Sequence, residues 1–454
     1  MRKSYLFTAI CFIAAAVMAV SGTDVYAGTT GKIQGVVRDA QTGESLPGAN
    51  VVLEGTKRGA TTDVNGFYII LLVDPGSYAM SASLIGYDAQ RKTDVRVQSD
   101  FTSEVNFLVR EAALQLGEMV VVAERPPVEP DRTTSKYVMG AADIENVPMV
   151  RSASEFIELQ AGVSVDGDVS IRAGDSEDTA YYVDGVRLQS TDGSTRVYRD
   201  VNKSSIQEMT VITGGMEAEY GNAQAGVVSF VTREGGQDYS GLVDYQFQPA
   251  GQKHWGANVY DSAIHRGQNQ WDSPEWVGET VTLPDGSSVP AHQRLDYTSK
   301  TGHFVEGNLS GPLTEGLTFF ASSKYTRTAA IFPSANLTTP YNTNTNLKLS
   351  YTASPTMKIR VGGFYDKREG NNRGPEEGGL LDIRNDGKNL FMVDHAPAGG
   401  REDTDWLGWA SITPSLSPKT FYELRLSMST SKRDTLGLPT GGGLATPETS
   451  ITSN

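Results

Sequence analysis

The sequence has almost none of the residues that form covalent or metal-based cross-links. Its 454 residues include one cysteine, Cys11, and five histidines (His254, His265, His292, His303 and His395). Cys11 lies in an N-terminal apolar run that is expected to be removed, so the mature chain would have no thiol. This excludes disulfides and cysteine-ligated metals, and packing and sheet closure must stabilise the fold instead.

Long apolar runs are also missing. After residue 27, no uncharged apolar run approaches the roughly 18–20 residues that a membrane-spanning helix requires. Any insertion into a membrane must therefore use strands.

Positive charge is in deficit, with 39 lysines and arginines against 54 acidic residues and a formal net charge of −15. This balance argues against nucleic acid as a partner and is typical of a well-solvated surface.

The first 27 residues have the pattern of a secretory signal peptide. Arg2 and Lys3 precede an apolar stretch from Tyr5 to Val20, and Val25-Tyr26-Ala27 supplies a small-residue cleavage site before Gly28. A signal anchor is the alternative, and the short apolar run followed by small residues disfavours it. We expect the exported, mature chain to begin near Gly28.

Residues 28–110 are predicted to form a small β-sandwich. Six strand-like runs alternate with turns rich in glycine, proline and aspartate (Ile33–Val37, Asn50–Leu53, Phe67–Leu72, Tyr78–Leu84, Thr93–Val97 and Glu104–Val109). Their spacing suggests seven strands. The strings Gly35-Val36-Val37-Arg38-Asp39, Leu46-Pro47-Gly48-Ala49, Gly66-Phe67-Tyr68 and Ile85-Gly86-Tyr87 closely resemble the carboxypeptidase-regulatory-like domain. That resemblance implies a transthyretin-like sandwich.

The name of that family does not predict peptidase activity here. All five histidines lie downstream of the domain, so it offers no imidazole for a zinc site of the common types. One His-x-x-Glu pair occurs at His303 and Glu306, but Gly302 to Leu309 is predicted to be a strand, where positions three apart point to opposite faces. We therefore expect no metal site, no cofactor and no catalytic residue.

Residues 111–134 are predicted to be a linker with a candidate coupling segment. The β-prone run Glu118-Met119-Val120-Val121-Val122-Ala123 is followed by Pro126, Pro127 and Pro130, which forbid a continuing strand. One interpretation is the last strand of the sandwich plus a stiff linker. The other is an extended peptide offered to the sheet edge of a partner. The run resembles a TonB box, which in its family passes energy from the inner membrane to the receptor.

Residues 135–236 are predicted to form a compact α/β domain. Ser152 and Glu155 have the spacing of a capping box before a helix over residues 153–160, which Gly162 ends. Phe156, Ile157 and Leu159 are expected on its buried side. Short strands are expected at Ser170–Arg172, Tyr181–Val183, Met209–Thr213 and Val227–Thr232.

Three strings of this domain resemble the plug of TonB-dependent receptors. They are Ile171-Arg172-Ala173-Gly174 followed by residues 181–186, then residues 206–215, then Glu219-Tyr220-Gly221 with residues 226–232. The commonest form of the first string has glycine where this chain has Ala173. We expect structural roles for the plug residues Arg172, Gly174, Asp184, Gly185, Gly214, Gly215, Tyr220 and Gly221. Asp184-Gly185 is a sequence typical of a hairpin turn. By analogy with the fold of the plug family, the loops at residues 175–179 and 189–200 would face a ligand.

Residues 237–454 are predicted to be strands of a transmembrane β-barrel. Leu347, Leu349 and Tyr351 alternate with polar neighbours, and other segments follow the same period of two. A soluble sandwich would alternate too, so the connections decide. Short turns near residues 311–316, 354–355 and 415–419 alternate with long connections at 249–297, 328–342 and 367–403, the pattern of outer-membrane barrels. Trp406 and Trp409 would suit the interfacial aromatic girdle.

The predicted fold class is therefore mainly β: a transthyretin-like sandwich, an α/β plug, and the first strands of an antiparallel barrel. We count about seven barrel strands, too few to close around the plug, and open edges in lipid leave backbone groups unsatisfied. We infer an N-terminal fragment or a truncated reading frame, and expect that the chain alone would not insert.

The leading hypothesis is an outer-membrane receptor that takes up a scarce ligand through a plugged barrel in a Gram-negative bacterium. By resemblance, its partners would be TonB with its inner-membrane energising complex, outer-membrane lipid and a surface-exposed substrate-binding lipoprotein, with the regulatory-like domain in the periplasm. An adhesin or structural surface protein of the same architecture is the alternative. A secreted enzyme fails for want of any nucleophile, base or metal constellation. The substrate stays open between siderophore, cobalamin, glycan and peptide.

Overall fold

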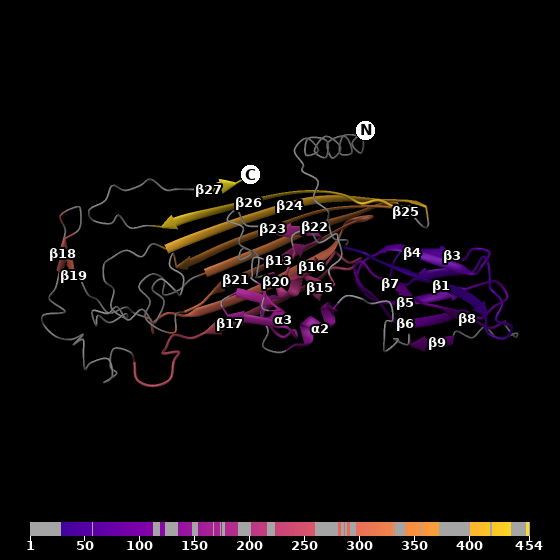
Figure 1. Cartoon of the computed structure of the whole chain (residues 1–454), viewed down its shortest axis with the longest axis horizontal. Helices are drawn as coiled ribbons and strands as arrows, with labels where there is room; N and C mark the ends of the chain where they lie inside the picture. The colour runs from indigo at the N-terminus through magenta and orange to yellow at the C-terminus, as the bar shows by residue number, and fades with distance from the viewer. Residues whose placement is uncertain are drawn as a thin grey trace.

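The computed structural model describes residues 29–111 (except 57), 119–122, 135–147, 153–188 (except 167, 173 and 175–177), 201–215, 223–258, 280–282, 286, 288–290, 297–329, 331, 341–371 (except 355), 400–436 (except 418–419) and 451–453. A small β-domain lies at one end, and a long antiparallel sheet extends away from it over a central α/β domain (Figure 1). Among the described residues, no helix is long and apolar enough to cross a membrane.

The N-terminal domain is a sandwich of two sheets. One has the order β4-β1-β7, with β8 also paired to β1, and the other has the order β3-β2-β5-β6-β9. Their strands are β1 (Gly31–Asp39), β2 (Asn50–Leu53), β3 (Gly59–Thr61), β4 (Phe67–Val73), β5 (Gly76–Ser83), β6 (Gln90–Val97), β7 (Thr102–Glu104), β8 (Phe107–Val109) and β9 (Met119–Val122). The core between the sheets includes Ile33, Leu53, Tyr68, Met80 and Phe107, each at most 1% exposed.

The expected strand Glu104–Val109 is divided, so the domain has more strands than the predicted seven. β1 pairs with β7 along Lys32–Gln34 and then with β8 along Val37–Asp39, both in parallel. Between the two stretches, a β-carbon at Gly35 would lie 1.9 Å from the carbonyl oxygen of Val105. Only glycine allows this close approach of the two backbones. The side chain of Asn106 accepts the N–H of Val36 at 2.8 Å, which replaces the interrupted ladder.

The central domain has a five-stranded sheet of order β10-β15-β16-β13-β14, in which β13 and β16 run parallel. Its elements are β10 (Ser135–Gly140), α2 (Ala141–Asn146), α3 (Ala153–Glu158), β11 (Val163–Asp166), β12 (Asp168–Ile171), β13 (Thr179–Val183), β14 (Val186–Leu188), the 3-10 helix η3 (Lys203–Ser205), β15 (Ile206–Gly214) and β16 (Gly226–Thr232). All residues of β13 and β16 are buried, so the sheet is covered on both faces.

The helix predicted from the capping pattern is present but shorter than expected. α3 ends at Glu158, and Gly162 follows with φ +83°. Phe156 and Ile157 are buried as predicted, at 0% and 1% exposure. Leu159 was placed on the buried side wrongly, because it lies beyond the helix end and is 62% exposed. Ser152, the expected cap, is outside the described residues.

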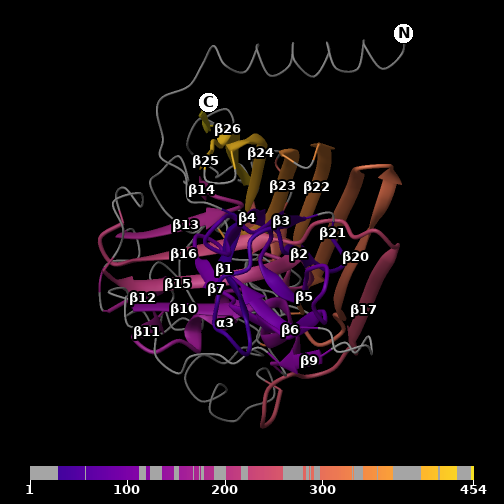
Figure 2. The same ribbon diagram turned by 90° about the vertical axis from the view of Figure 1, so that its right-hand side faces the viewer.

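The C-terminal region is one long antiparallel sheet of order β17-β20-β21-β22-β23-β24-β26-β27, with β25 paired to β24. The strands are β17 (Ser240–Gln248), β20 (Gly302–Thr314), β21 (Leu317–Arg327), β22 (Tyr341–Ser354), β23 (Met357–Asn371), β24 (Gly400–Ser417), β25 (Thr420–Phe421), β26 (Leu424–Leu436) and β27 (Ile451–Ser453). A separate hairpin pairs β18 (Thr280–Thr282) with β19 (Ser288–Pro290). Seen from the side, the long strands curve around one side of the central domain (Figure 2).

This curved wall has one apolar and one polar face. On β22, Leu347 and Tyr351 are 49% and 43% exposed, whereas the intervening Lys348 and Ser350 are buried. The expected apolar-out, polar-in alternation is therefore confirmed. Trp406 is exposed as an outer aromatic should be, but Trp409 faces inward and is only 6% exposed. Its assignment to the outer girdle was wrong, since residues three apart on a strand point to opposite faces.

Candidate functional site

The central domain packs directly on the inner face of the wall. Phe364, Leu407 and Trp409 of the wall belong to the same buried cluster as Phe156 and Phe230 of the central domain. The two parts therefore share an apolar core, which fixes the distance between them. Around this core, the interface is polar and charged.

A buried ion pair connects the central sheet with the wall. Lys348 Nζ lies 2.8 Å from Asp184 Oδ1, and the two side chains are 3% and 2% exposed. The same ammonium group donates to the carbonyl oxygen of Thr232 at 2.8 Å. Asp184 in turn accepts the N–H of Thr232 at 2.9 Å and its hydroxyl at 2.6 Å. Both charges thus lie in a closed set of partners, as a buried ion pair requires.

The 3-10 helix of the central domain makes a second polar contact with the wall. The amide of Asn202 donates to Ser322 Oγ at 3.1 Å and to the carbonyl oxygen of Asn344 at 3.3 Å. The N–H of Ser204 donates to Glu306 at 2.8 Å. Glu306 points inward, whereas the ring of His303 stacks on Tyr245. The prediction that His303 and Glu306 cannot act together on one metal ion is consistent with this geometry.

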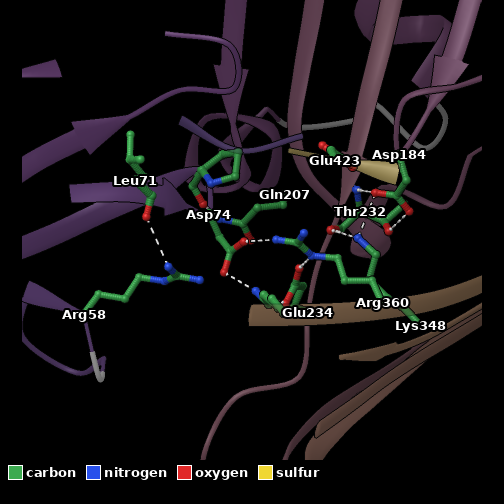
Figure 3. A network of polar contacts seen from close by, with 12 residues as sticks. Arg58, Leu71, Asp74, Asp184, Gln207, Thr232, Glu234, Lys348, Arg360 and Glu423 are labelled. Carbon is green, nitrogen blue, oxygen red and sulfur yellow. Dashed lines mark hydrogen bonds and ion pairs between the residues drawn. The ribbon is translucent and has the colours of Figure 1, made fainter. Parts of the chain in front are cut away.

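Three parts of the chain meet at a quartet of alternating charges (Figure 3). Lys358 Nζ lies 2.7 Å from both Asp74 and Glu234. Arg360 lies 2.8 Å from Asp74 and 2.6 Å from Glu234. Asp74 comes from the turn between β4 and β5, Glu234 follows β16, and both bases are on β23. The quartet therefore ties the sandwich, the central domain and the wall together at one point.

Burial and charge oppose each other in the quartet. Burial and the neighbouring Glu234 raise the pKa of Asp74, but Lys358 and Arg360 outweigh them and leave it lowered. Burial also raises the pKa of Glu234, whereas the same two bases and Lys348 hold it well below its ordinary value. Both acids are therefore ionised near neutral pH, and the quartet is a set of true ion pairs.

The sandwich and the central domain share further contacts beside the quartet. Glu208, which is 2% exposed, accepts hydrogen bonds from the backbone N–H and the hydroxyl of Ser99. Burial raises the pKa of Glu208, and the Ser99 bonds oppose that rise. Gln207 Nε2 donates to the carbonyl oxygen of Pro75 at 2.9 Å. At the edge of the contact, Arg96 pairs with Asp143 at 3.1 Å.

Most of the predicted plug residues lie in turns or at close approaches of the chain. Asp184 and Gly185 both have positive φ, +48° and +74°, and form the hairpin between β13 and β14. Arg172, with φ +53°, lies against Gly214, where a β-carbon would come within 2.5 Å of its guanidinium. Gly174 faces Ala225 in the same way, at 2.6 Å. Gly215 has φ +68°, and Tyr220 and Gly221 lie outside the described residues.

The candidate TonB box is placed in part. Met119–Val122 form β9, which pairs in parallel with β6, from Gln90↔Met119 to Thr93↔Val122. Glu118 and Ala123 lie outside the described residues, as do most of the two loops expected to face a ligand. In this structure, the segment is thus the edge strand of the sandwich.

Two hollows lie on the described surface. One, of about 820 Å³, is lined by β1, β6 and β8 of the sandwich. The other, of about 720 Å³, lies on the inner face of the wall at the end with the long connections. Its lining includes amides and hydroxyls with Lys324, Arg368 and Glu155 of α3. Within the described chain, no group of three or more His, Cys, Asp or Glu residues could hold a metal ion.

Sequence reasoning missed the charged contacts between domains. It named Asp184 only as a turn residue and did not single out Asp74, Glu234, Lys358 or Arg360. A signal was available, because the period of two places Lys348, Lys358 and Arg360 on the inner face of the wall. Their acidic partners could not be found this way, since Asp74 and Lys358 lie 284 residues apart.

Two family matches agree with this architecture. Residues 33–121 match the CarboxypepD_reg-like domain, and residues 130–228 match the TonB-dependent receptor plug domain. The sandwich therefore matches a carboxypeptidase-regulatory-like domain, and the wall-bound α/β domain matches a TonB-dependent receptor plug. The chain carries these two domains in this order and is similar to TonB-dependent receptors.

Individual relatives are distant. The chain is 27% identical over 272 residues to the TonB-dependent transporter Oar of Myxococcus xanthus, covering 56% of this chain and 25% of that protein. It is 27% identical to the TonB-dependent receptor SusC of Bacteroides thetaiotaomicron, covering 47% of this chain and 22% of that protein. The chain thus spans about a quarter of the length of these curated relatives.

Similar solved structures include the siderophore receptor PirA from Pseudomonas aeruginosa, with 17% identity and a TM-score of 0.44 over 69% of this chain and 42% of that chain. PirA from Acinetobacter baumannii has 16% identity and a TM-score of 0.46 over 70% and 43% of the two chains.

Proposed function

We propose that this chain forms part of an energy-coupled outer-membrane receptor that imports a scarce ligand past its plug with the help of TonB. The observation that carries the proposal is the plug domain itself, which packs on the inner face of a transmembrane-type wall through a shared apolar core and the buried Lys348–Asp184 pair. The match of residues 130–228 to a TonB-dependent receptor plug favours transport over adhesion.

The geometry supports a definite orientation. The sandwich contacts β23 through Lys358 and Arg360, close to the short turn between β22 and β23. In outer-membrane barrels, the short turns face the periplasm and the long connections face the outside. The sandwich therefore belongs in the periplasm, and the hollow near Glu155 belongs on the ligand side.

The test is capture of the TonB periplasmic domain by the intact receptor. Replacing both Val120 and Val121 with proline removes the backbone donors that strand addition needs, so capture should be abolished. The matched control replaces both with threonine, which keeps the donors and the β preference. If neither the parent protein nor the control captures TonB, the proposed function is wrong.

A further inference from the structure

The segment proposed to receive TonB is already in use inside the receptor. β9 pairs in parallel with β6 over four residues and, among the strands that the structure describes, is the last of its sheet. An edge strand has one row of backbone groups without a neighbouring strand, so it can be exchanged without disturbing a strand beyond it. Four residues provide only a few ladder hydrogen bonds, so the backbone pairing that holds β9 on β6 is limited.

β6 is held in place independently of β9. On its other edge it pairs with β5, from Gly76↔Val97 to Ala82↔Gln90. Its Arg91 forms a two-pronged ion pair with Glu54, which directly follows β2, with contacts of 2.7–3.0 Å. Gln90 accepts the N–H of Leu108 in the opposite sheet at 2.8 Å. β6 would therefore keep its position when β9 leaves.

The side chains described as the sandwich core all lie upstream of β9. The buried cluster that the structure describes runs from Ile33 to Val109 and joins both sheets. Tyr68, 1% exposed, extends across it to donate its hydroxyl to the carbonyl oxygen of Val105 at 2.6 Å. A domain with such a core can lose a four-residue edge strand and stay folded.

The sandwich as a body is attached much more firmly than β9. Asp74 is bonded to two bases of the wall, and Glu208 of the plug is buried against Ser99. Charge-assisted bonds of this kind are roughly twice as strong as neutral ones. Separating the sandwich would also leave Lys358 and Arg360 with one acid of the quartet instead of two, which is costly for buried charges.

We propose that the regulatory-like domain stores Met119–Val122 as an exchangeable edge strand and stays docked while that strand is taken. The partner is a protein with a free sheet edge, here the periplasmic domain of TonB, which competes with β6 for the same backbone groups. This rests on the proposed function. The domain thereby sets how much of the time the segment is available, since capture scales with the fraction of β9 that is released.

Two cross-links separate the release of β9 from the release of the domain. The mature chain is expected to have no cysteine, so two introduced cysteines have no other thiol in the chain to react with. Thr93→Cys with Val122→Cys joins β6 to β9 at a paired position. Arg96→Cys with Asp143→Cys, bridged by a short bis-maleimide, joins the sandwich to the plug at an exposed ion pair. The probe is the purified TonB periplasmic domain, and its Kd for the intact receptor is measured.

We expect the disulfide formed in the Thr93→Cys, Val122→Cys variant to weaken capture of TonB by roughly 100-fold, and we expect full recovery after the disulfide is reduced. The bis-maleimide bridge in the Arg96→Cys, Asp143→Cys variant should change the Kd for TonB less than about threefold. The single cysteine variants control for folding. Equal binding by the oxidised and reduced forms would show that β9 need not leave, and loss of binding in the bridged form would show that the domain must undock. Either result overturns the inference while leaving the proposed function intact; no capture by any form overturns both.

Discussion

Replacing Lys348 with methionine is the sharpest test of how the plug is held. The substitution keeps an unbranched side chain close in length to the apolar stem of lysine but leaves Asp184, 1% exposed, without its counter-charge. Thr232 still donates two hydrogen bonds to the carboxylate, which lessens the loss. Breaking one partner of a buried pair costs about 3–5 kcal/mol, and we expect the lower end of that range.

The assay is hydrogen exchange of the β16 amides in the intact receptor, which reports local opening of the plug sheet. Since about 1.4 kcal/mol corresponds to a factor of ten, a loss of about 3 kcal/mol should speed exchange on the order of 100-fold. Lys432→Met is the control, because its pair with Asp434 is exposed at 49% and 29%. Exposed pairs contribute about 0–1 kcal/mol. Unchanged β16 exchange in Lys348→Met would refute the idea that this pair holds the plug.

Three further outcomes are expected. Gly226→Ala places a β-carbon 2.5 Å from Ile171 Cδ1 and 2.9 Å from the carbonyl oxygen of Ile212 and should lower plug stability by about 1–3 kcal/mol, measured by denaturant titration. Leu347→Arg puts a charge on the outer face of the wall and should reduce membrane insertion at a cost of about 2–4 kcal/mol if the site is near the bilayer centre, measured as the inserted fraction. Acidification should loosen the quartet, because the pKa values of Asp74 and Glu234 are lowered in the folded protein. The stability that these two carboxylates contribute is present above their ordinary pKa values of 3.8 and 4.5 and is lost as the pH falls through their folded-state pKa values. The measurement is Tm as a function of pH.

Each of these outcomes has a matched control. Gly140→Ala should be nearly silent, because a β-carbon there meets only Asp143, at 3.8 Å. Leu347→Val should insert normally. Asp74→Asn should flatten the decline of Tm in acid, since one of the titrating groups is gone. A steeper decline in that variant would contradict the proposed source of the pH dependence.

The sequence predicts the wall well, because its period of two is a local property. Each residue of β22 has its face set by its neighbours, so Leu347 and Lys348 could be assigned without knowing what they contact. The same rule separates Trp406 from Trp409, and applying it would have placed Trp409 against the plug. That error came from treating aromatic content as sufficient for an interfacial position.

Contacts between domains could not be predicted in this way. The pairing of Asp74 with Lys358 depends on how two folded bodies dock, and neither a turn aspartate nor a strand lysine has a pattern that names its partner. The candidate TonB box shows the same limit. Its β preference predicts a strand for Met119–Val122, but both a sandwich edge and a partner's sheet satisfy that preference, and only the structure shows which edge is occupied here.

The mixture of contacts around the plug fits the import that we propose. The apolar cluster of Phe364, Leu407 and Trp409 contributes stability through burial, whereas the Lys348–Asp184 pair contributes little beyond the cost of removing its charges from water. Such a pair instead penalises every wrong placement of the plug, because each would leave a buried charge unpaired. When the plug moves and water enters, both charges are solvated again, so the cost of separation falls as separation proceeds. A wholly apolar interface lacks this effect, so an apolar core combined with a few buried charges suits a plug that must be well placed and must move during the proposed import.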